Sequence, residues 1–361
     1  MKIGILTLQG ASNYGAVLQV LGLSEYLKSK GHEVEVIDYY TPEVYGYYDY
    51  RVFSKPITLR SVVSKAVRYR QNRAEVQAFN EFRGSYLEFS DRCSDAKTLG
   101  LVCNNYEAVI CGSDQIWNPI ANGGHNPEYY FGPVDGSKVK KIAYAASYGS
   151  VSKANGLESQ ISHWLADFTA VSVRESEAVE FLEPLIHGSV ERVIDPSMLL
   201  DASDYRIFEK PINAPARYLL TYMLGTNEDM AEAAVAASRK LGLTMVCLGR
   251  KIADGQFIKN IGPGEFLYLF HHAEAVITSS FHGTAFSLLY GKPFVTFGNG
   301  GYNSRMETLL DAVGQLDRFI SIEADLEALM ASLSSSPAPE FSAAAAGERQ
   351  RAAKFLDEAL K

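Results

Sequence analysis

The chain has 361 residues, too many for one ordinary hydrophobic core, which indicates two domains. Hydrophobic residues make up 47% and charged residues 21%, a composition that excludes a disordered chain and predicts a well-packed globular protein. The net charge of −8 argues against nucleic acid as a partner, because phosphate neutralisation requires a basic surface.

Strands alternate with helices through the first half of the chain. Residues 2–6 are predicted as a strand that leads through a loop into an amphipathic helix over residues 15–28. Further strands are predicted at residues 33–37, 108–111, 141–145 and 170–173. This alternation indicates a parallel sheet covered by helices on both faces.

One segment near residues 39–91 interrupts the alternation. It begins with tyrosines at Tyr39, Tyr40, Tyr45, Tyr47, Tyr48 and Tyr50. Residues 51–73 follow with seven basic and no acidic residues, and one helical face there would carry Leu59, Val62, Val63, Ala66 and Val67. A basic amphipathic helix of this kind can rest on an anionic membrane surface or hold a lipid-linked diphosphate. The alternative is a solvated surface helix in an inserted segment.

A second series of strands and helices begins after residue 200. Its strands are predicted at residues 218–222, 244–248, 275–278 and 294–297, with an alanine-rich helix over residues 230–240. We therefore expect two Rossmann-like domains facing a cleft, residues 1–200 and 201–335. A linker and helix over residues 336–361 are expected to cross back to the first domain.

The most informative stretch is residues 277–295, predicted as a strand, a small-residue turn, a helix and another strand. The turn contains Ser280, His282 and Gly283 and lies at a helix N-terminus, where free N–H groups and the helix dipole favour an anion. His282 can contact that anion and also transfer a proton at neutral pH. The alternative is that His282 only caps the helix.

Two arginines are candidates for the same anion. Arg174 directly follows a predicted strand and is suited to bidentate capture of phosphate or carboxylate. Its alternative role is a surface ion pair with Glu175 or Glu177. Arg305 follows a glycine-containing loop, from which it can close over a ligand, and its alternative is an ordinary arginine at a helix start. With His282 and a helix N-terminus, these arginines indicate a small polyanion.

The loop over residues 112–119 is dense in polar side chains around one tryptophan. Carboxylate and amide groups beside an aromatic face suit the hydroxyls and the apolar face of a sugar. Contacts with an acceptor sugar are therefore expected from Gln115, Trp117 and Asn118. Asn13, at the end of the loop after the first strand, is expected to join them. Asp114 is a candidate base for a hydroxyl. The alternative is a turn in which Asp114 and Asn118 satisfy backbone amides.

Other signatures of chemistry are weak or missing from the sequence. The first loop lacks the GxGxxG fingerprint, and there is no P-loop, HExxH or GxSxG motif. We interpret His271 and His272 as a cation pair at a helix C-terminus, so neither a metal nor a cofactor is expected. The four cysteines show no metal-ligand spacing, which predicts reduced thiols in a cytoplasmic protein.

Taken in chain order, these segments resemble the polysaccharide pyruvyl transferase family. The matching parts are residues 5–16, 112–119, 171–175, 195–196, 279–295 and 303–305. The resemblance implies a GT-B-like α/β fold with the acceptor on the first domain and the donor on the second. It also implies that pyruvate moves from phosphoenolpyruvate, a co-substrate, onto two sugar hydroxyls as a cyclic ketal, with release of phosphate.

The resemblance further implies that Arg174 and His282 bind phosphoenolpyruvate, with His282 a hypothetical proton donor. A second basic residue is expected downstream, Lys292 or Arg305, and we favour Arg305 because it starts a loop-to-helix segment. The acceptor is expected to be a bacterial surface-polysaccharide precursor. If it is linked to polyprenyl diphosphate, the protein is expected at the inner face of the cell membrane. Alternatives are a GT-B glycosyltransferase that uses a nucleotide sugar and a non-catalytic glycan-binding protein.

Overall fold

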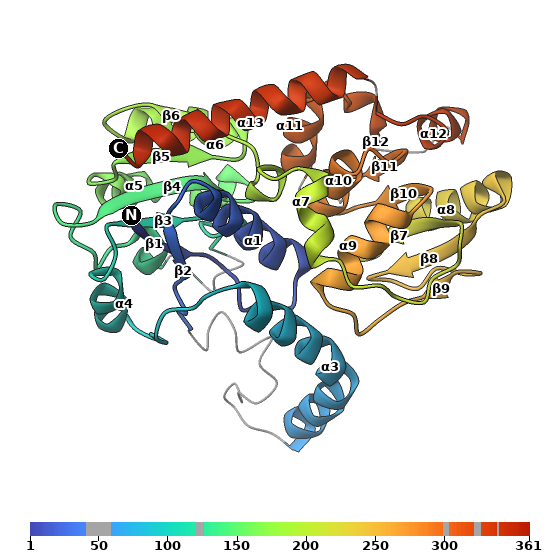
Figure 1. The fold of residues 1–361 in the computed structure, drawn as a ribbon, viewed down its shortest axis with the longest axis horizontal. Helices are drawn as coiled ribbons and strands as arrows, with labels where there is room; N and C mark the ends of the chain where they lie inside the picture. Colours follow the sequence, from blue (N-terminus) through green and yellow to red (C-terminus); the bar gives the residue numbers. More distant parts are fainter. Residues whose placement is uncertain (41–58, 120–123, 125, 299–302, 321–325, 338) are drawn as a thin grey trace. The chain divides into compact units, whose positions relative to one another are not determined.

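The computed structural model describes residues 1–40, 59–119, 124, 126–298, 303–320, 326–337 and 339–361, with the backbone alone at residues 59–72, 153, 326 and 339–342. The chain forms two compact units, each built on one six-stranded sheet (Figure 1). The first unit is Met1–Leu200 with Arg349–Lys361, and the second unit is Asp201–Glu348.

The sheet of the first unit has the strand order β2-β1-β3-β4-β5-β6, and every neighbouring pair is parallel. Its strands are β1 (Lys2–Leu6), β2 (Glu33–Val36), β3 (Ala108–Cys111), β4 (Lys140–Ala146), β5 (Ala170–Val173) and β6 (Val190–Arg192). The predicted strands are confirmed. The short strand β6 was missed, because the alternation of one apolar and two charged residues over three positions is too weak a signal.

Helices cover both faces of this sheet. The helices of the first unit are α1 (Tyr14–Ser29), α3 (Leu59–Tyr86), α4 (Ala96–Cys103), α5 (Glu158–Leu165) and α6 (Ser176–Leu182), with short 3-10 turns η1 (Pro127–Tyr130), η2 (Val151–Ala154), η3 (Glu183–Leu185) and η4 (Pro196–Met198). One core cluster joins strand residues to Leu99 of α4, Ile161 of α5 and Leu182 of α6. The C-terminal segment packs on the same unit, where the rings of Tyr144 and Phe355 lie 6.2 Å apart.

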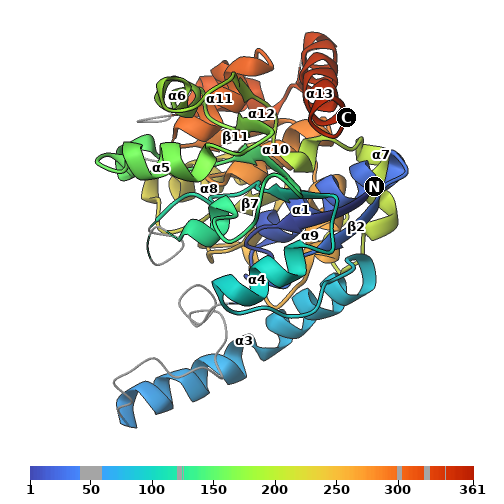
Figure 2. The same ribbon diagram turned by 90° about the vertical axis from the view of Figure 1, so that its left-hand side faces the viewer.

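Helix α3 extends away from the sheet of the first unit in both views (Figures 1 and 2). Its C-terminal part is anchored, since Phe79, Phe82 and Arg83 are all buried. The tyrosines from Tyr45 to Tyr50 and the side chains of the predicted basic amphipathic face lie outside the described residues. Among the described helices, none combines the length and apolarity needed to cross a bilayer.

The sheet of the second unit has the order β12-β11-β10-β7-β8-β9 and is also parallel throughout. Its strands are β7 (Tyr218–Tyr222), β8 (Thr244–Leu248), β9 (Gln256–Phe257), β10 (Ala275–Thr278), β11 (Phe294–Phe297) and β12 (Phe319–Ile320). Its helices are α7 (Ala202–Tyr205), α8 (Glu228–Leu241), α9 (Pro263–His272), α10 (Phe281–Leu289), α11 (Ser304–Ala312), α12 (Leu326–Leu333) and α13 (Pro339–Ala359), which continues into the first unit, with turns η5 (Arg206–Phe208) and η6 (Leu316–Arg318).

The two faces of the second sheet are packed differently. Helices α8 and α12 cover one face through small and aliphatic side chains such as Ala234 and Leu329. An aromatic cluster from α9 and α10 meets Tyr222 on the other face, where the rings of Phe266 and Phe286 lie 5.8 Å apart in a T-shaped arrangement. This packing sets the N-terminus of α10 at the carboxyl edge of the sheet.

Candidate active site

The turn between β10 and α10 is tied to the sheet by hydrogen bonds. Thr278 Oγ1 accepts the Ser280 N–H at 3.1 Å and donates to the Tyr222 carbonyl at 2.9 Å. Ser280 is the N-cap of α10, and its hydroxyl accepts the Gly283 N–H at 3.4 Å. The first turn of α10 therefore holds its N–H groups in a defined position, as an anion site at a helix N-terminus requires.

Gly283 allows α10 to approach β10 closely. A Cβ atom at this position would lie only 2.1 Å from Thr278 Oγ1. Because both hydrogen bonds of that hydroxyl hold it in place, a larger residue at position 283 would displace the start of the helix.

His282 and Arg305 both contact the ring of Phe281. The imidazole lies edge-on, with ring centroids 5.1 Å apart, and the Arg305 guanidinium is 5.9 Å from the Phe281 centroid. Arg305 comes from the first turn of α11, beyond the end of β11, and His282 is buried with 8% of its surface exposed. The second unit thus brings Ser280, His282, Gly283 and Arg305 to one sheet edge.

Lys292 lies at the opposite edge of the same sheet. It precedes β11, whereas Arg305 follows it. Burial lowers the pKa of Lys292, an effect that Glu274 and Glu209 only partly offset. The topology therefore favours Arg305 as the basic residue that works with His282.

In the first unit, Arg174 extends from the end of β5 to a carboxylate beyond β6. Its Nη1 donates to Asp195 Oδ2 at 2.6 Å, and both side chains are almost fully buried. Asp195 is held in turn, because its Oδ1 accepts the Ser197 hydroxyl at 2.7 Å and its Oδ2 accepts the Ser113 hydroxyl at 3.1 Å. The pair predicted as an alternative, Arg174 with Glu175, is present at 3.7 Å, but Asp195 is the closer partner.

Several negative charges surround Arg174. Burial alone would lower the pKa of Arg174, but the carboxylates of Asp195, Glu175 and Asp114 outweigh it and raise that pKa. Three carboxylates near one guanidinium therefore balance the positive charge of Arg174. An anion gains more from the α10 edge of the second unit, where a helix N-terminus adds to Arg305 and His282.

The loop after β3 carries most of the predicted acceptor residues. Asp114 is half-buried in the left-handed region at φ 59°, and Gln115 Oε1 accepts a hydrogen bond from Asn118 Nδ2. Asn13, after β1, is exposed, and its Oδ1 caps α1 by accepting the Gly15 N–H at 2.9 Å. Both β1 and β3 end at the same edge, so the loop and Asn13 belong to one sheet edge.

Trp117 packs into the core of the first unit, with 2% of its surface exposed. Its Nε1 donates to the Tyr129 carbonyl at 3.1 Å, and its ring stacks on that of Tyr130 with centroids 4.9 Å apart. In this arrangement Trp117 supports the loop from beneath. Its contact with a sugar stays a prediction that requires the ring to be uncovered.

Arg83 is a residue that sequence reasoning missed. From α3 its Nη1 donates to the carbonyls of Gln9 at 2.9 Å and Ala11 at 3.1 Å, in the loop between β1 and α1. Its Nη2 donates to Asn80 Oδ1 at 2.7 Å. The sequence signal for this role was weak, because it consisted only of an arginine next to the apolar residues Phe79 and Phe82 of the helix. Arg83 thereby connects α3 to the loop that carries Asn13.

We expect Arg83→Ala to destabilise the first unit by about 2–3 kcal/mol, because two buried carbonyl groups lose their charged donor. Urea unfolding followed by tryptophan fluorescence measures this directly, since both tryptophans, Trp117 and Trp164, lie in the first unit. Arg73→Ala, at an exposed position of the same helix, is the matched control. Equal unfolding midpoints for the two variants would contradict the assignment.

Comparison with known proteins extends these observations. The sequence matches the family Polysaccharide pyruvyl transferase over residues 13–301, whereas no curated protein matches it. Two similar solved structures are UDP-GlcNAc 2-epimerases, from Methanocaldococcus jannaschii (13% identity, TM-score 0.54) and, bound to UDP-GlcNAc, from Neisseria meningitidis (10%, TM-score 0.51); each alignment covers 99% of both chains.

An alpha-glucosyltransferase in complex with UDP and a 13-mer DNA is similar at 12% identity with a TM-score of 0.51, over 99% of this chain and 95% of that one. At such identities the likeness concerns the fold alone, and it confirms the predicted GT-B-like α/β fold with two parallel sheets. The match over residues 13–301 covers most of the chain, which therefore belongs to the polysaccharide pyruvyl transferase family.

Proposed function

We propose that the protein transfers pyruvate from phosphoenolpyruvate onto two hydroxyls of a sugar in a bacterial surface-polysaccharide precursor. The product is a cyclic ketal, and phosphate is released. Membership of the pyruvyl transferase family supports a transferase of this class. The choice of phosphoenolpyruvate as donor rests on the α10 edge, where a capped helix N-terminus, His282 and Arg305 lie together.

Phosphoenolpyruvate carries two anionic groups, a carboxylate and a phosphate, on three carbons. Its binding site must therefore offer positive charge or N–H donors at two positions. We assign one anionic group to the N–H groups at the start of α10 and to Arg305. Arg174 is assigned a contact with the donor as well. Because neighbouring carboxylates already balance its charge, Arg174 would contribute directed hydrogen bonds, with Asp195 fixing the orientation of its guanidinium.

The reaction needs one proton added and two removed. A sugar hydroxyl bonds to C2 of phosphoenolpyruvate while C3 takes a proton and becomes a methyl group. We assign that proton to His282 and removal of the hydroxyl proton to Asp114. The second hydroxyl then bonds to C2 as the C2–O bond to phosphate breaks, and the proton of that hydroxyl passes to the departing phosphate. Phosphate leaves with that bonding pair, and the ketal is complete.

The acceptor is assigned to the edge of the first unit. Asn13, Gln115 and Asn118 offer amide groups beside Asp114, which suits a neutral sugar better than a second anion. We propose further that the acceptor is linked to polyprenyl diphosphate. Its sequence basis, the basic segment at residues 51–73, falls mainly on side chains outside the described residues.

Binding of the donor should depend on Arg305 and not on Lys292. We expect Arg305→Met to weaken phosphoenolpyruvate binding by about 10-fold or more, the usual value of a charge-assisted hydrogen bond. Lys292→Met is the matched control at the opposite sheet edge and should change the affinity by less than about 2-fold. Isothermal titration calorimetry measures both. A stronger effect of Lys292→Met would reverse the assignment.

Thermal shift with different donors tests the reaction class. The proposal predicts that phosphoenolpyruvate raises the melting temperature, while UDP-GlcNAc and CMP-sugars do not. Stabilisation by a nucleotide sugar alone would instead support a GT-B glycosyltransferase. A response to none of these donors, together with binding of glycans, would support a non-catalytic glycan-binding protein.

A further inference from the structure

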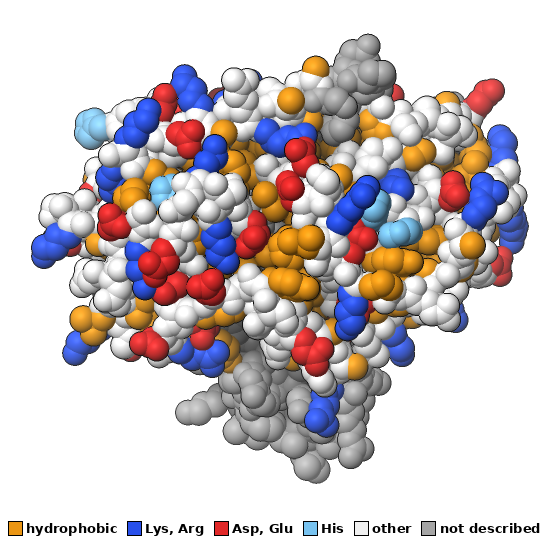
Figure 3. Space-filling view, in the orientation of Figure 1, with side chains coloured by type: hydrophobic (Ala, Val, Ile, Leu, Met, Phe, Trp, Pro, Cys, Tyr) orange, Lys and Arg blue, Asp and Glu red, His pale blue; other side chains and the backbone are white. Residues whose placement is uncertain are grey.

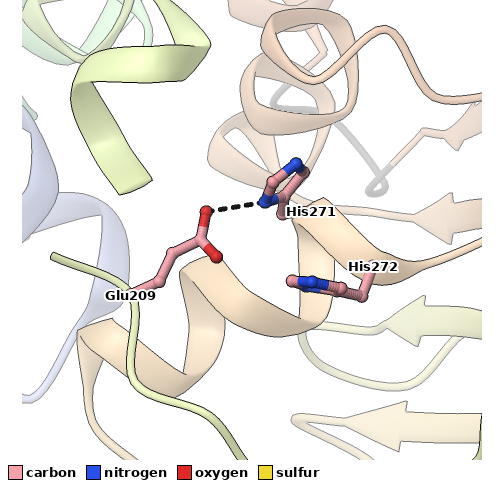
Figure 4. Close-up of side chains that lie close together, drawn as sticks. All are labelled: Glu209, His271 and His272. Atoms are coloured by element: carbon pink, nitrogen blue, oxygen red, sulfur yellow. Dashed lines mark hydrogen bonds and ion pairs between the residues drawn. The ribbon is translucent and has the colours of Figure 1, made fainter. Parts of the chain in front are cut away.

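Three side chains capable of metal binding converge in the second unit, away from the α10 turn. Glu209 follows η5, and His271 and His272 are the last two residues of α9. Glu209 Oε1 and His271 Nδ1 are 2.8 Å apart, and one ligand atom from each of the three residues lies within 4.8 Å of the others. Figure 4 shows the carboxylate directed at His271, with the ring of His272 beside them.

Contacts around the cluster fix both rings. His272 Nδ1 lies 2.9 Å from the Tyr268 carbonyl oxygen. Because a carbonyl only accepts, Nδ1 of the neutral ring carries the proton, and Nε2 keeps the lone pair that a metal needs. The His272 ring stacks on Tyr268 at 4.0 Å, and the His271 ring stacks on Tyr290 at 4.9 Å. The ligand orientations are thus largely set in advance.

The local charges also suit a cation. The C-terminus of α9 contributes the negative end of a helix dipole, and Glu209 contributes a carboxylate. Lys292 opposes binding of a cation, because it places a positive charge near His271. Glu274 partly compensates this charge.

We propose that Glu209, His271 and His272 bind one divalent transition-metal ion of the zinc class, with water completing the coordination. Two nitrogen and one oxygen ligands are a common zinc set, and donor atoms in a tetrahedral site lie about 3.3 Å apart. The ligand atoms lie within 4.8 Å of one another, so small movements of these side chains are needed to reach that spacing. His272 is exposed and His271 is half-buried, which leaves the cluster open to solvent, and Figure 3 shows histidine side chains at the surface beside acidic and basic ones.

The metal would act as a clamp and not in the chemistry. Helix α9 runs into the start of β10, whereas Ser280 and His282 follow the end of that strand. The segment after η5 is already tied to the start of α9, where the Lys210 N–H donates to the Gly264 carbonyl at 3.0 Å. A metal at Glu209 would tie the same segment to the end of the helix. The proposal departs from the interpretation of His271 and His272 as a cation pair, because the third ligand, Glu209, lies 62 positions before His271 and is brought to it only by the fold.

Zinc titration of the untagged full-length protein, freed of metal with EDTA, tests the site. Zn²⁺ is added in competition with a chromophoric chelator, and the melting temperature is followed in parallel. We expect one saturable site per chain and a rise in melting temperature. His272→Gln and Glu209→Gln should each weaken Zn²⁺ binding at least about 10-fold and remove most of the thermal shift.

His187→Gln, an exposed histidine of the first unit, is the matched control and should bind Zn²⁺ like the unmodified protein. His272 is exposed, so its variant is expected to fold, which keeps the test valid if Glu209→Gln does not. Absence of saturable binding in the unmodified protein would overturn the proposal. So would a His272→Gln titration that matches that of His187→Gln.

Discussion

Replacing His282 with glutamine is expected to slow phosphate release from phosphoenolpyruvate by about 100-fold or more, the usual contribution of a general acid. Glutamine keeps a hydrogen-bonding side chain of similar reach but cannot supply the proton that C3 requires. Binding of phosphoenolpyruvate should fall by only a few fold, because Arg305 and the N–H groups of α10 remain in place. Calorimetry and a phosphate-release assay separate these two effects.

The control for this variant is His187→Gln, which changes an exposed histidine in the other unit and should leave turnover unchanged. If His282→Gln turned over at the normal rate with normal donor binding, His282 would have no catalytic role. If binding and turnover fell together by the same factor, His282 would hold the donor without donating the proton.

Gly283→Ala is expected to displace the start of α10 and to destabilise the second unit. The new Cβ would lie 2.1 Å from Thr278 Oγ1, a hydroxyl already held by Ser280 and Tyr222. We expect a loss of about 1–3 kcal/mol, typical of overpacking, and displacement of the first turn of α10. Because that turn carries the proposed anion site, phosphoenolpyruvate binding should weaken as well.

Hydrogen–deuterium exchange over α10, together with thermal unfolding, measures the change. Gly347→Ala is the matched control: it lies in α13 of the second unit, and an added Cβ there meets nothing within 4 Å. It should be neutral or stabilising, since alanine favours a helix. In a Thr278→Ala background the cost of Gly283→Ala should shrink, because the clashing hydroxyl is gone. An additive double mutant would refute the proposed clash.

The sheets could be predicted from sequence because buried parallel strands are short, continuous apolar runs. Strands β3, β10 and β11 are of this kind, and their predicted bounds agree with the structure. The turn that holds His282 could also be predicted from sequence, because an apolar run, two serines and a segment with helical periodicity follow one another. Short edge strands such as β6 and β12 lacked any comparable pattern.

Contacts between distant parts of the chain could not be predicted. Arg174 and Asp195 lie 21 positions apart, and Arg83 contacts carbonyls 72 and 74 positions away. Nothing in a local pattern indicates such pairings. Trp117 shows the same limit for burial, because its place in the core depends on Tyr130 and Tyr148, which arrive from other parts of the chain.

The proposed pyruvyl transfer is tested most directly by incubating the protein with phosphoenolpyruvate and a panel of free and lipid-linked glycans. Mass spectrometry follows the glycans, and a phosphate assay runs in parallel, with His282→Gln as the control. We predict at least one glycan that gains a pyruvyl ketal, with one phosphate released for each ketal formed. Glycosyl transfer from a nucleotide sugar, without any ketal from phosphoenolpyruvate across the panel, would contradict the account.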